Sequence, residues 1–219
     1  MVLHLHREIE LLKKHIIHEA TMVEDNLRDS ILALIIKDEE LANDIIARDD
    51  AIDIKEVELE EECLKIFALY QPVAVDLRYL VAFLKLNNDL ERIGDLASNI
   101  AARAASLSRQ KSITIPDTIP KISTIVQKML KNSIEAIIDL DGKKAADVLE
   151  MDDEVDAKHF AMFQMIADRI KEQPDSVESW LEVLAISRYL ERIADHCTNI
   201  CEDVEYMLSG HIHRHQNKS

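Results

Sequence analysis

Glycine, proline and aromatic residues are scarce in this chain of 219 residues. It contains 3 Gly and 4 Pro, and only 4% of its residues are Phe, Trp or Tyr. A β-sandwich or β-barrel needs many tight turns, which glycine and proline favour, and strands rich in aromatic and β-branched residues. The sequence supplies neither, and we therefore predict an all-α protein.

Long apolar runs and basic clusters are also missing. No apolar run approaches the roughly 20 residues of a membrane-spanning helix, and the first ten residues are too polar for a signal peptide. With 26 Lys and Arg against 42 Asp and Glu, the net charge of −16 repels the phosphate backbone of nucleic acid. The odd number of cysteines, 3, fits free thiols in a reducing compartment. We expect a cytoplasmic protein that binds no nucleic acid.

Helical periodicity fills most of the sequence. Apolar residues recur at steps of three and four, and the pattern is interrupted by glycine, proline or an N-capping aspartate. The pattern predicts six helices, at about 3–37, 38–71, 75–108, 118–140, 143–172 and 176–208. Residues 108–117 break the periodicity, and we interpret them as a linker between two halves.

The two halves repeat one another. Residues 89–100 (DLERIGDLASNI) and 189–200 (YLERIADHCTNI) are identical at seven of twelve positions. A D-D-x-x-D motif at 49–53 recurs at 152–156, and a Gln-Pro break precedes the third helix of each half. We therefore predict two tandem three-helix bundles of long antiparallel helices, over residues 1–110 and 111–219, the second ending in a short His-rich tail.

Acidic residues one helical turn apart occupy matched positions in both halves. The pairs are Asp49 with Asp53, Glu91 with Asp95, Asp152 with Asp156, and Glu191 with Asp195. A helical wheel places the pairs of the third and sixth helices opposite the apolar seam, and those of the second and fifth helices beside it. Carboxylates at this spacing repel one another, and a hard cation held between neighbouring helices would offset the repulsion. These eight residues are candidate metal ligands, and further candidates on the same edges are Glu56, His159 and Glu202.

Two other interpretations apply to these acids. A chain with 42 acidic residues also places such pairs on solvated helix faces by chance, which leaves a metal-free helical scaffold open. An enzyme is not expected, because the chain lacks the Glu-x-x-His motif of di-iron bundle enzymes, a Gly-rich phosphate loop and a nucleophile motif. Cys197 and Cys201, one turn apart beside His196, fit core packing better than a ligand set.

Three segments resemble the PhoU family, and the resemblance covers essentially the whole chain. They are L-E-R-I-G-D at 90–95 with A-x-N-I-A at 97–101, Q-P-x-A-x-D-L-R at 71–78, and L-E-R-I-A-D-H at 190–196. The resemblance implies two three-helix bundles in a non-enzymatic, cytoplasmic negative regulator of phosphate uptake and of the phosphate-starvation response. The implied partners are the ATPase subunit of the phosphate ABC transporter and a sensor histidine kinase. It also implies a homodimer that reaches the membrane through protein partners only.

Some PhoU-like proteins bind multinuclear metal clusters through E/D-x-x-x-D motifs, one cluster in each bundle. Carried onto this sequence, the motifs fall on the eight residues above, and iron, zinc or manganese are the implied ions. PhoU-like bundles also occur beside ion-coupled phosphate carriers, so an accessory regulator of such a carrier is the alternative.

The sequence departs from the family pattern in three places. Leu96 stands where the family often has histidine, whereas the second half keeps His196. His159 takes the place of Glu56, which makes the second site richer in nitrogen and more tolerant of zinc. The C-terminal histidines are not typical of the family and are interpreted as a frayed tail or an adventitious chelator: His211, His213 and His215.

Overall fold

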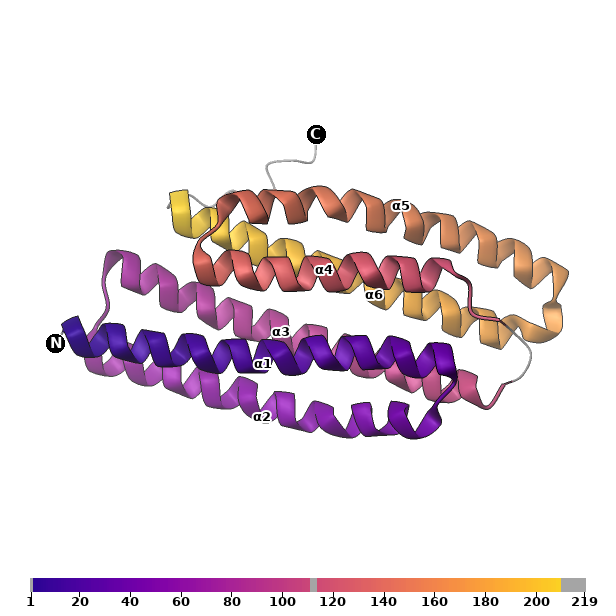
Figure 1. Ribbon diagram of the computed structural model, residues 1–219, viewed down its shortest axis with the longest axis horizontal. Coiled ribbons are helices and arrows are strands. Elements are labelled where there is room, and N and C mark those ends of the chain that lie inside the picture. The colour runs from indigo at the N-terminus through magenta and orange to yellow at the C-terminus, as the bar shows by residue number, and fades with distance from the viewer. Residues whose placement is uncertain (1, 111–113, 210–219) are drawn as a thin grey trace.

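The computed structural model describes residues 2–110 and 114–209, and six long helices make up nearly all of this part of the chain. They are α1 (Val2–Ile36), α2 (Glu39–Tyr70), α3 (Ala74–Ser108), α4 (Thr118–Asp139), α5 (Gly142–Glu172) and α6 (Val177–Ser209) (Figure 1). A 3₁₀ turn at Pro174–Ser176 precedes α6, and no strand occurs within the described ranges. The predicted all-α class is confirmed, and each predicted helix bound lies within one residue of the observed one.

Capping chemistry explains where the helices begin and end. The carboxylate of Asp38 accepts a hydrogen bond from the backbone N–H of Leu41 at 3.0 Å, which caps the start of α2. Asp141 does the same for α5, accepting from the backbone N–H groups of Lys143 and Lys144 at 3.0 Å. Gln71 takes a left-handed conformation, with φ of 46°, and Pro72 follows it, so α2 cannot continue. The matched caps of α2 and α5 extend the internal repeat to the turns.

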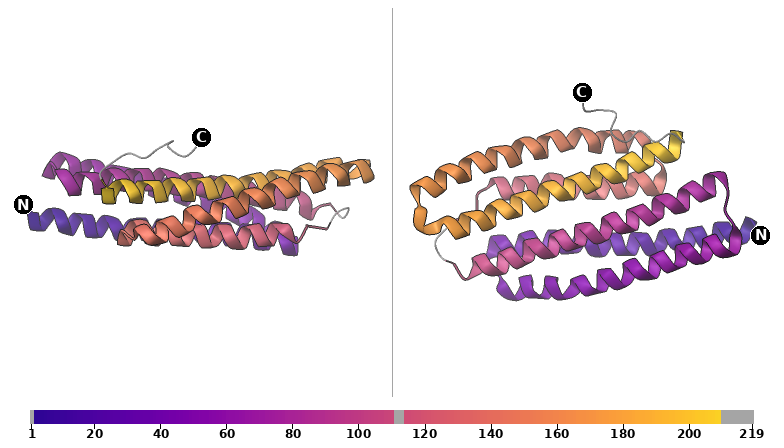
Figure 2. Two further views of the ribbon diagram at one scale, coloured as in Figure 1. Left: turned by 90° about the horizontal axis from the view of Figure 1, so that it is seen from above. Right: turned by 180° about the vertical axis from the view of Figure 1, so that it is seen from behind.

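The six helices form two layers. Helices α2, α3, α6 and α5 lie side by side in that order in one layer, and α1 and α4 cover one of its faces (Figure 2). Helices α1 to α3 pack together as the first bundle, and α4 to α6 as the second, with α3 and α6 in contact between them. The predicted division at residue 110 borders residues 111–113, which lie outside the described residues, so the domain boundary stays a prediction.

A single apolar core runs through both bundles. The seam residues Leu90, Ile93 and Ile100 of α3 are 0% exposed, as are their counterparts on α6. Because α3 and α6 are each packed against two helices of their own bundle and against one another, apolar residues are buried over a wide arc of both. The three cysteines are free and buried, which confirms the expected packing of Cys197 and Cys201 in the core. None of the described helices combines the length and apolar character of a membrane span.

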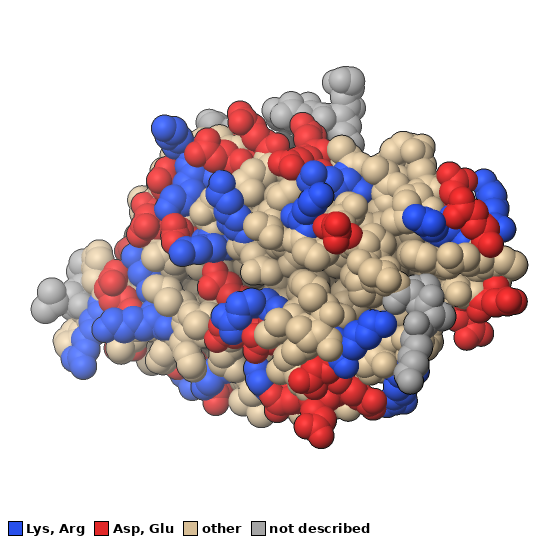
Figure 3. Space-filling model, turned by 45° about the vertical axis from the view of Figure 1, so that its right-hand side comes forward, with Lys and Arg blue, Asp and Glu red and all other residues tan. Residues whose placement is uncertain are grey.

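Charged side chains join the bundles and cover the surface. Between α3 and α6, Lys85 Nζ lies 2.6 Å from Asp203 Oδ1, and Arg103 Nη1 lies 3.0 Å from Glu182 Oε2. On the face seen in Figure 3, Lys and Arg side chains are intermingled with Asp and Glu. Many such charges pair within one helix or between neighbours, as Arg48 does with Asp29 of α1 at 3.0 Å.

Candidate metal centre

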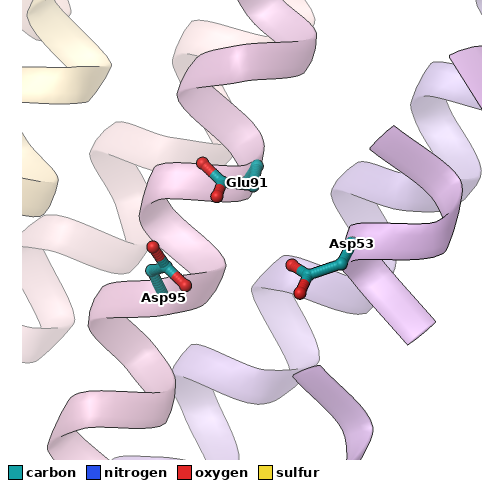
Figure 4. A group of neighbouring side chains, drawn as sticks. All are labelled: Asp53, Glu91 and Asp95. Carbon is teal, nitrogen blue, oxygen red and sulfur yellow. The ribbon is translucent and has the colours of Figure 1, made fainter. Parts of the chain in front are cut away.

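Three carboxylates converge between α2 and α3. One oxygen from each of Asp53, Glu91 and Asp95 lies within 4.8 Å of the others, and Asp53 points from α2 towards the two residues of α3 (Figure 4). Glu91 and Asp95 are half-buried beside α2, whereas the helical wheel placed them opposite the seam. The difference arises because α3 packs against three helices, so that little of its circumference faces solvent.

Glycine at position 94 lets α2 approach α3 beside these carboxylates. A Cβ atom at Gly94 would lie 3.3 Å from Ile52 Cδ1 and 3.4 Å from Asp49 Oδ1. Because Gly94 has no side chain, the carboxylate of Asp49 can lie against the α3 backbone on the turn between Glu91 and Asp95. The close approach brings the acidic edge of α2 to the acidic edge of α3.

Asp49 has a buried oxygen that the chain leaves unsatisfied. Its Oδ1 atom has no hydrogen-bond partner. The pKa of Asp49 is raised to about 6, chiefly by burial; the carboxylates of Asp95 and Asp53 also raise it, and a hydrogen bond from Ser98 lowers it. The pKa of Glu91 is also raised, first by burial and then by Asp95. A site made of oxygen atoms, with an orphaned acceptor and mutual repulsion, fits a hard cation.

The second bundle repeats this electrostatic arrangement. Asp152 Oδ1 is buried without a hydrogen-bond partner, as is Glu191 Oε2. The pKa of Asp152 is raised to about 6, first by burial and then by the carboxylates of Asp156 and Asp195. The four predicted ligands of the second bundle therefore lie close enough to perturb one another.

The two acidic groups differ in compactness. Within the described ranges, three ligand atoms approach to within 4.8 Å only in the first bundle. In the second bundle Arg188 Nη1 lies 2.5 Å from Glu191 Oε1, whereas the first half has Asn88 at the matching position. Arg188 therefore binds one carboxylate oxygen of Glu191, whereas the matching Asn88 offers Glu91 no positive charge.

Glu56 and His159 occupy matched places beside the two acidic groups. His159 Nδ1 is hydrogen-bonded to Ser187 Oγ at 2.8 Å, which orients the ring and leaves Nε2 as its ligand atom. Burial, and then Arg188, lower the pKa of His159 and so favour the neutral ring that metals require. In the first bundle, Asn87 Nδ2 instead donates to the backbone oxygen of Glu56 at 2.9 Å.

Two of the singled-out residues lie towards the boundary between the bundles. Glu202 is exposed and lines a groove between α3 and α6 with Lys85 and Asn199, and a ligand role for it stays a prediction. His196 Nδ1 lies 2.8 Å from Asp89 Oδ1 of α3, so this histidine joins the two bundles. The three histidines at 211–215 lie outside the described residues.

Sequence reasoning missed one acidic residue, Glu19 on α1. Its side chain is 0% exposed and neither carboxylate oxygen has a hydrogen-bond partner. The pKa of Glu19 is raised to about 8, first by burial and then by the carboxylates of Glu56 and Glu91. A signal was present, because Glu19 follows Ile16 by three residues and precedes Val23 by four, and therefore lies on the apolar stripe.

Comparison with known proteins identifies the family. The family model described as "PhoU domain" matches this chain twice, over residues 16–104 and 119–204. Among curated relatives, the "Phosphate-specific transport system accessory protein PhoU homolog 1" of Thermotoga maritima is 35% identical over 96% of this chain and 92% of its own length. The corresponding PhoU homologue of Pseudomonas aeruginosa is 34% identical, over 95% of this chain and 86% of its own length.

Solved structures agree with the sequence comparison. The crystal structure of PhoU from Pseudomonas aeruginosa superposes with a TM-score of 0.91 at 34% identity, over 94% of this chain and 99% of that one. The phosphate transport system regulatory protein PhoU from Streptococcus pneumoniae gives a TM-score of 0.89 at 27% identity, over 95% and 98% of the two chains. The family model matches most of the chain, and relatives and solved structures agree with it over nearly the whole length, so the chain belongs to the PhoU family.

Proposed function

We propose that this protein is a non-enzymatic negative regulator of phosphate uptake and phosphate-starvation signalling, and that it binds metal ions through the acidic group of each bundle. Membership of the PhoU family supports the regulatory role, because the curated relatives are named accessory proteins of phosphate-specific transport systems. The single observation that supports metal binding best is the convergence of Asp53, Glu91 and Asp95 within 4.8 Å on two helices.

The donor atoms suggest which metals each site would take. Asp49, Asp53, Glu91 and Asp95 offer only carboxylate oxygens, which suit manganese and iron(II). His159 adds an imidazole nitrogen to Asp152, Asp156, Glu191 and Asp195, which makes zinc or iron suitable in the second bundle. A bound cation would neutralise the repelling carboxylates and so hold α2 against α3, and α5 against α6. Each site has several carboxylates, which is enough to bind a cluster of more than one metal ion.

The proposed mode of action is cytoplasmic and works through protein partners. Metal binding would convert the two acidic groups into ordered, less negative surfaces, and these surfaces would contact the ATPase subunit of the phosphate ABC transporter or a sensor histidine kinase. Contact with either partner would restrain uptake or signalling, and the protein would be peripheral to the membrane through these partners only. We also propose a homodimer, for which the exposed Phe160 and Phe163 of α5 offer apolar surface.

Elemental analysis of purified protein tests the metal sites. Chains carrying Glu91→Ala with Asp95→Ala, or Glu191→Ala with Asp195→Ala, should each lose the metal of one bundle while their helical content is retained. Glu150→Ala with Glu154→Ala is the matched control, because it removes two exposed acids one turn apart from α5 and should leave the metal content unchanged. Full metal content in the first two variants would contradict the sites, and a metal-free wild-type chain after incubation with iron, zinc and manganese would favour a helical scaffold.

Affinity capture from the native cell tests the partner. We expect the wild-type chain to recover the phosphate transporter ATPase or the histidine kinase. A variant that combines Glu91→Ala, Asp95→Ala, Glu191→Ala and Asp195→Ala should recover less of it. Recovery of an ion-coupled phosphate carrier instead would establish the alternative regulator.

A further inference from the structure

The first bundle contains a carboxylate beneath its surface acidic group. Glu19 of α1 is 0% exposed, and both of its oxygens are buried without a hydrogen-bond partner. An ionised carboxylate in such a position is strongly unfavourable unless a cation or a set of donors balances it. The chain itself provides no such partner among the described residues, since no ion pair or hydrogen bond to Glu19 is formed.

The register of the helices places Glu19 at the level of two other acids. His15 Nδ1 contacts Glu62 Oε2 at 2.8 Å and Asp29 contacts Arg48 at 3.0 Å, which sets α1 antiparallel to α2. In this register Glu19 lies level with the turn of α2 that begins at Glu56. On the other side, α3 is tied to that turn by the hydrogen bond from Asn87 to the Glu56 backbone, one turn before Glu91.

Electrostatics agrees with this placement. The carboxylates that raise the pKa of Glu19, after burial itself, are those of Glu56 and Glu91. Glu91 also belongs to the surface group with Asp53 and Asp95, so that it lies between the buried acid and the surface. The nearby cation Arg92 is more than half exposed and pairs outward, 3.4 Å from Glu91 and 3.6 Å from Asp95.

Acceptors outnumber donors inside the first bundle. Besides both oxygens of Glu19, Asn87 Oδ1 and Asp49 Oδ1 are buried without partners, whereas the unpartnered buried donor atoms among the described residues of this bundle are Asn26 Nδ2 and Arg78 Nε. Each of the four oxygens is an acceptor or metal ligand, and none can satisfy another without a proton or a cation between them. A bound cation with oxygen ligands would satisfy several of them at once.

The second bundle shows that the fold does not require a buried acid here. Helices α1 and α4 end at matching left-handed residues, Lys37 and Leu140. Counting back from these residues shows that Ile122 occupies the position in α4 that Glu19 occupies in α1. Ile122 is 0% exposed and fills the place with an apolar side chain. At the other two inner positions, His159 replaces Glu56 and Ser187 replaces Asn87.

We propose that Glu19 is an inner ligand of the first-bundle metal site. The ligand atoms that already meet within 4.8 Å are those of Asp53, Glu91 and Asp95, and a hard divalent cation below them would draw the carboxylates of Glu19 and Glu56 towards Glu91. The second bundle, with Ile122 and His159 at the matching positions, lacks this inner all-oxygen site, so the two bundles differ in metal preference. This inference rests on the metal binding proposed above and deepens it for the first bundle.

Mn²⁺ titration of the full chain tests the inner site. The background carries Glu191→Ala and Asp195→Ala, so that the remaining binding reports on the first bundle. Glu19→Gln keeps the shape of the side chain and Glu19→Ile copies the second bundle, and each should weaken Mn²⁺ binding by roughly tenfold to a hundredfold or more. Glu10→Gln, the same change at an exposed position of α1, should leave the affinity unchanged.

Thermal unfolding of the metal-free chain provides a second readout. Because Glu19→Ile removes an unsatisfied buried carboxylate, its metal-free form should unfold at a higher temperature than the parent, and Mn²⁺ should stabilise it less. Unchanged Mn²⁺ affinity in both Glu19 variants, in a parent whose binding is abolished by Glu91→Ala with Asp95→Ala, would overturn the inner ligand alone. A metal-free midpoint that falls in Glu19→Ile, with Mn²⁺ affinity unaltered, would likewise assign Glu19 a packing role. Failure of the wild-type chain to bind Mn²⁺ or any other of the tested metals would overturn the proposed function itself.

Discussion

Lys85 of α3 and Asp203 of α6 form an ion pair of 2.6 Å across the boundary between the two bundles, and the Asp203 side chain is only 5% exposed. Other polar contacts between these helices are Arg103–Glu182, Ser106–Glu182 and His196–Asp89. The Lys85–Asp203 pair thus ties a buried carboxylate of the second bundle to a lysine of the first. The two bundles that carry the acidic groups are therefore joined by specific polar contacts as well as by apolar packing.

Lys85→Met should destabilise the protein by about 1–3 kcal/mol, because Asp203 stays buried without this lysine. Urea denaturation monitored by circular dichroism measures the change. Lys171→Met is the control, since its ion pair with Asp168 is largely exposed and should contribute little. A loss no larger than that of the control would show that the pair does not hold the bundles together.

Gly94→Leu should separate α2 from α3 and weaken metal binding in the first bundle. A Cβ atom there already meets Ile52 and Asp49 at 3.3–3.4 Å, so a longer side chain forces the helices apart and should destabilise the protein by about 1–3 kcal/mol. Gly94→Ala should change stability by less than about 1 kcal/mol, because better helix propensity offsets the closer contact. Calorimetric titration with Mn²⁺ and urea denaturation check both variants, and full affinity in Gly94→Leu would contradict the role of close helix approach.

The metal-free protein should lose stability as the pH rises from about 4 to about 8. The folded-state pKa values of Asp49 and Asp152 are raised to about 6, and that of Glu19 to about 8. A carboxyl group with a raised folded-state pKa contributes stability when protonated, and this contribution is lost as the pH rises through that pKa. Urea midpoints from pH 4 to pH 8 measure the effect, which Glu19→Gln should reduce most between pH 6 and pH 8. Stability that rises over this range in the metal-free chain would contradict the burial of these groups without cations.

His159→Glu should shift the metal preference of the second bundle from zinc towards manganese. The substitution replaces the imidazole nitrogen by the carboxylate found at Glu56 in the first half, and oxygen ligands favour manganese. Competition between Zn²⁺ and Mn²⁺ in a background of Glu91→Ala with Asp95→Ala measures the ratio of affinities. Ser187→Ala should weaken zinc binding by roughly tenfold, because the ring loses the hydrogen bond that orients it. An unchanged ratio in His159→Glu would remove His159 from the ligand set.

The three cysteines should not react with a thiol reagent until the protein unfolds. Burial raises the pKa of Cys63 and of Cys201 to about 12, and raises that of Cys197 as well, so almost no thiolate is present at neutral pH. A colorimetric thiol assay should find no fast-reacting thiol in the native chain and three in guanidinium chloride. A rapidly reacting thiol in the native protein would contradict the packing of α2 and α6.

Local sequence features determined the elements of this fold. The helix bounds follow from apolar periodicity together with Asp38, Asp141 and the two Gln-Pro breaks, all of which act within a few residues along the chain. The tandem repeat predicted two bundles, because three helices with the same apolar pattern in each half are expected to pack together in the same way. The acidic pairs could also be read directly, since residues four apart share one helix face in any helix.

The environment of each acid depended on the neighbours that tertiary packing supplied. The wheel placed Glu91 and Asp95 opposite the seam, yet packing on three sides of α3 leaves them half-buried beside α2. His196 could be seen one residue after Asp195, but only the contact of α6 with α3 makes Asp89 its partner. Glu19 could be placed on the apolar stripe of α1, whereas its unsatisfied burial depends on how α2 and α3 close over it.

The sequence by itself thus determined six helices, their ends, their repeat and the acidic pairs, because each of these depends on residues within one or two turns. Only the tertiary structure decided which carboxylates meet between helices, which of them lose water, and which find a cation. Burial and charge pairing are properties of residues tens of positions apart, and small differences such as Gly94 or Arg188 change them without changing the helical pattern.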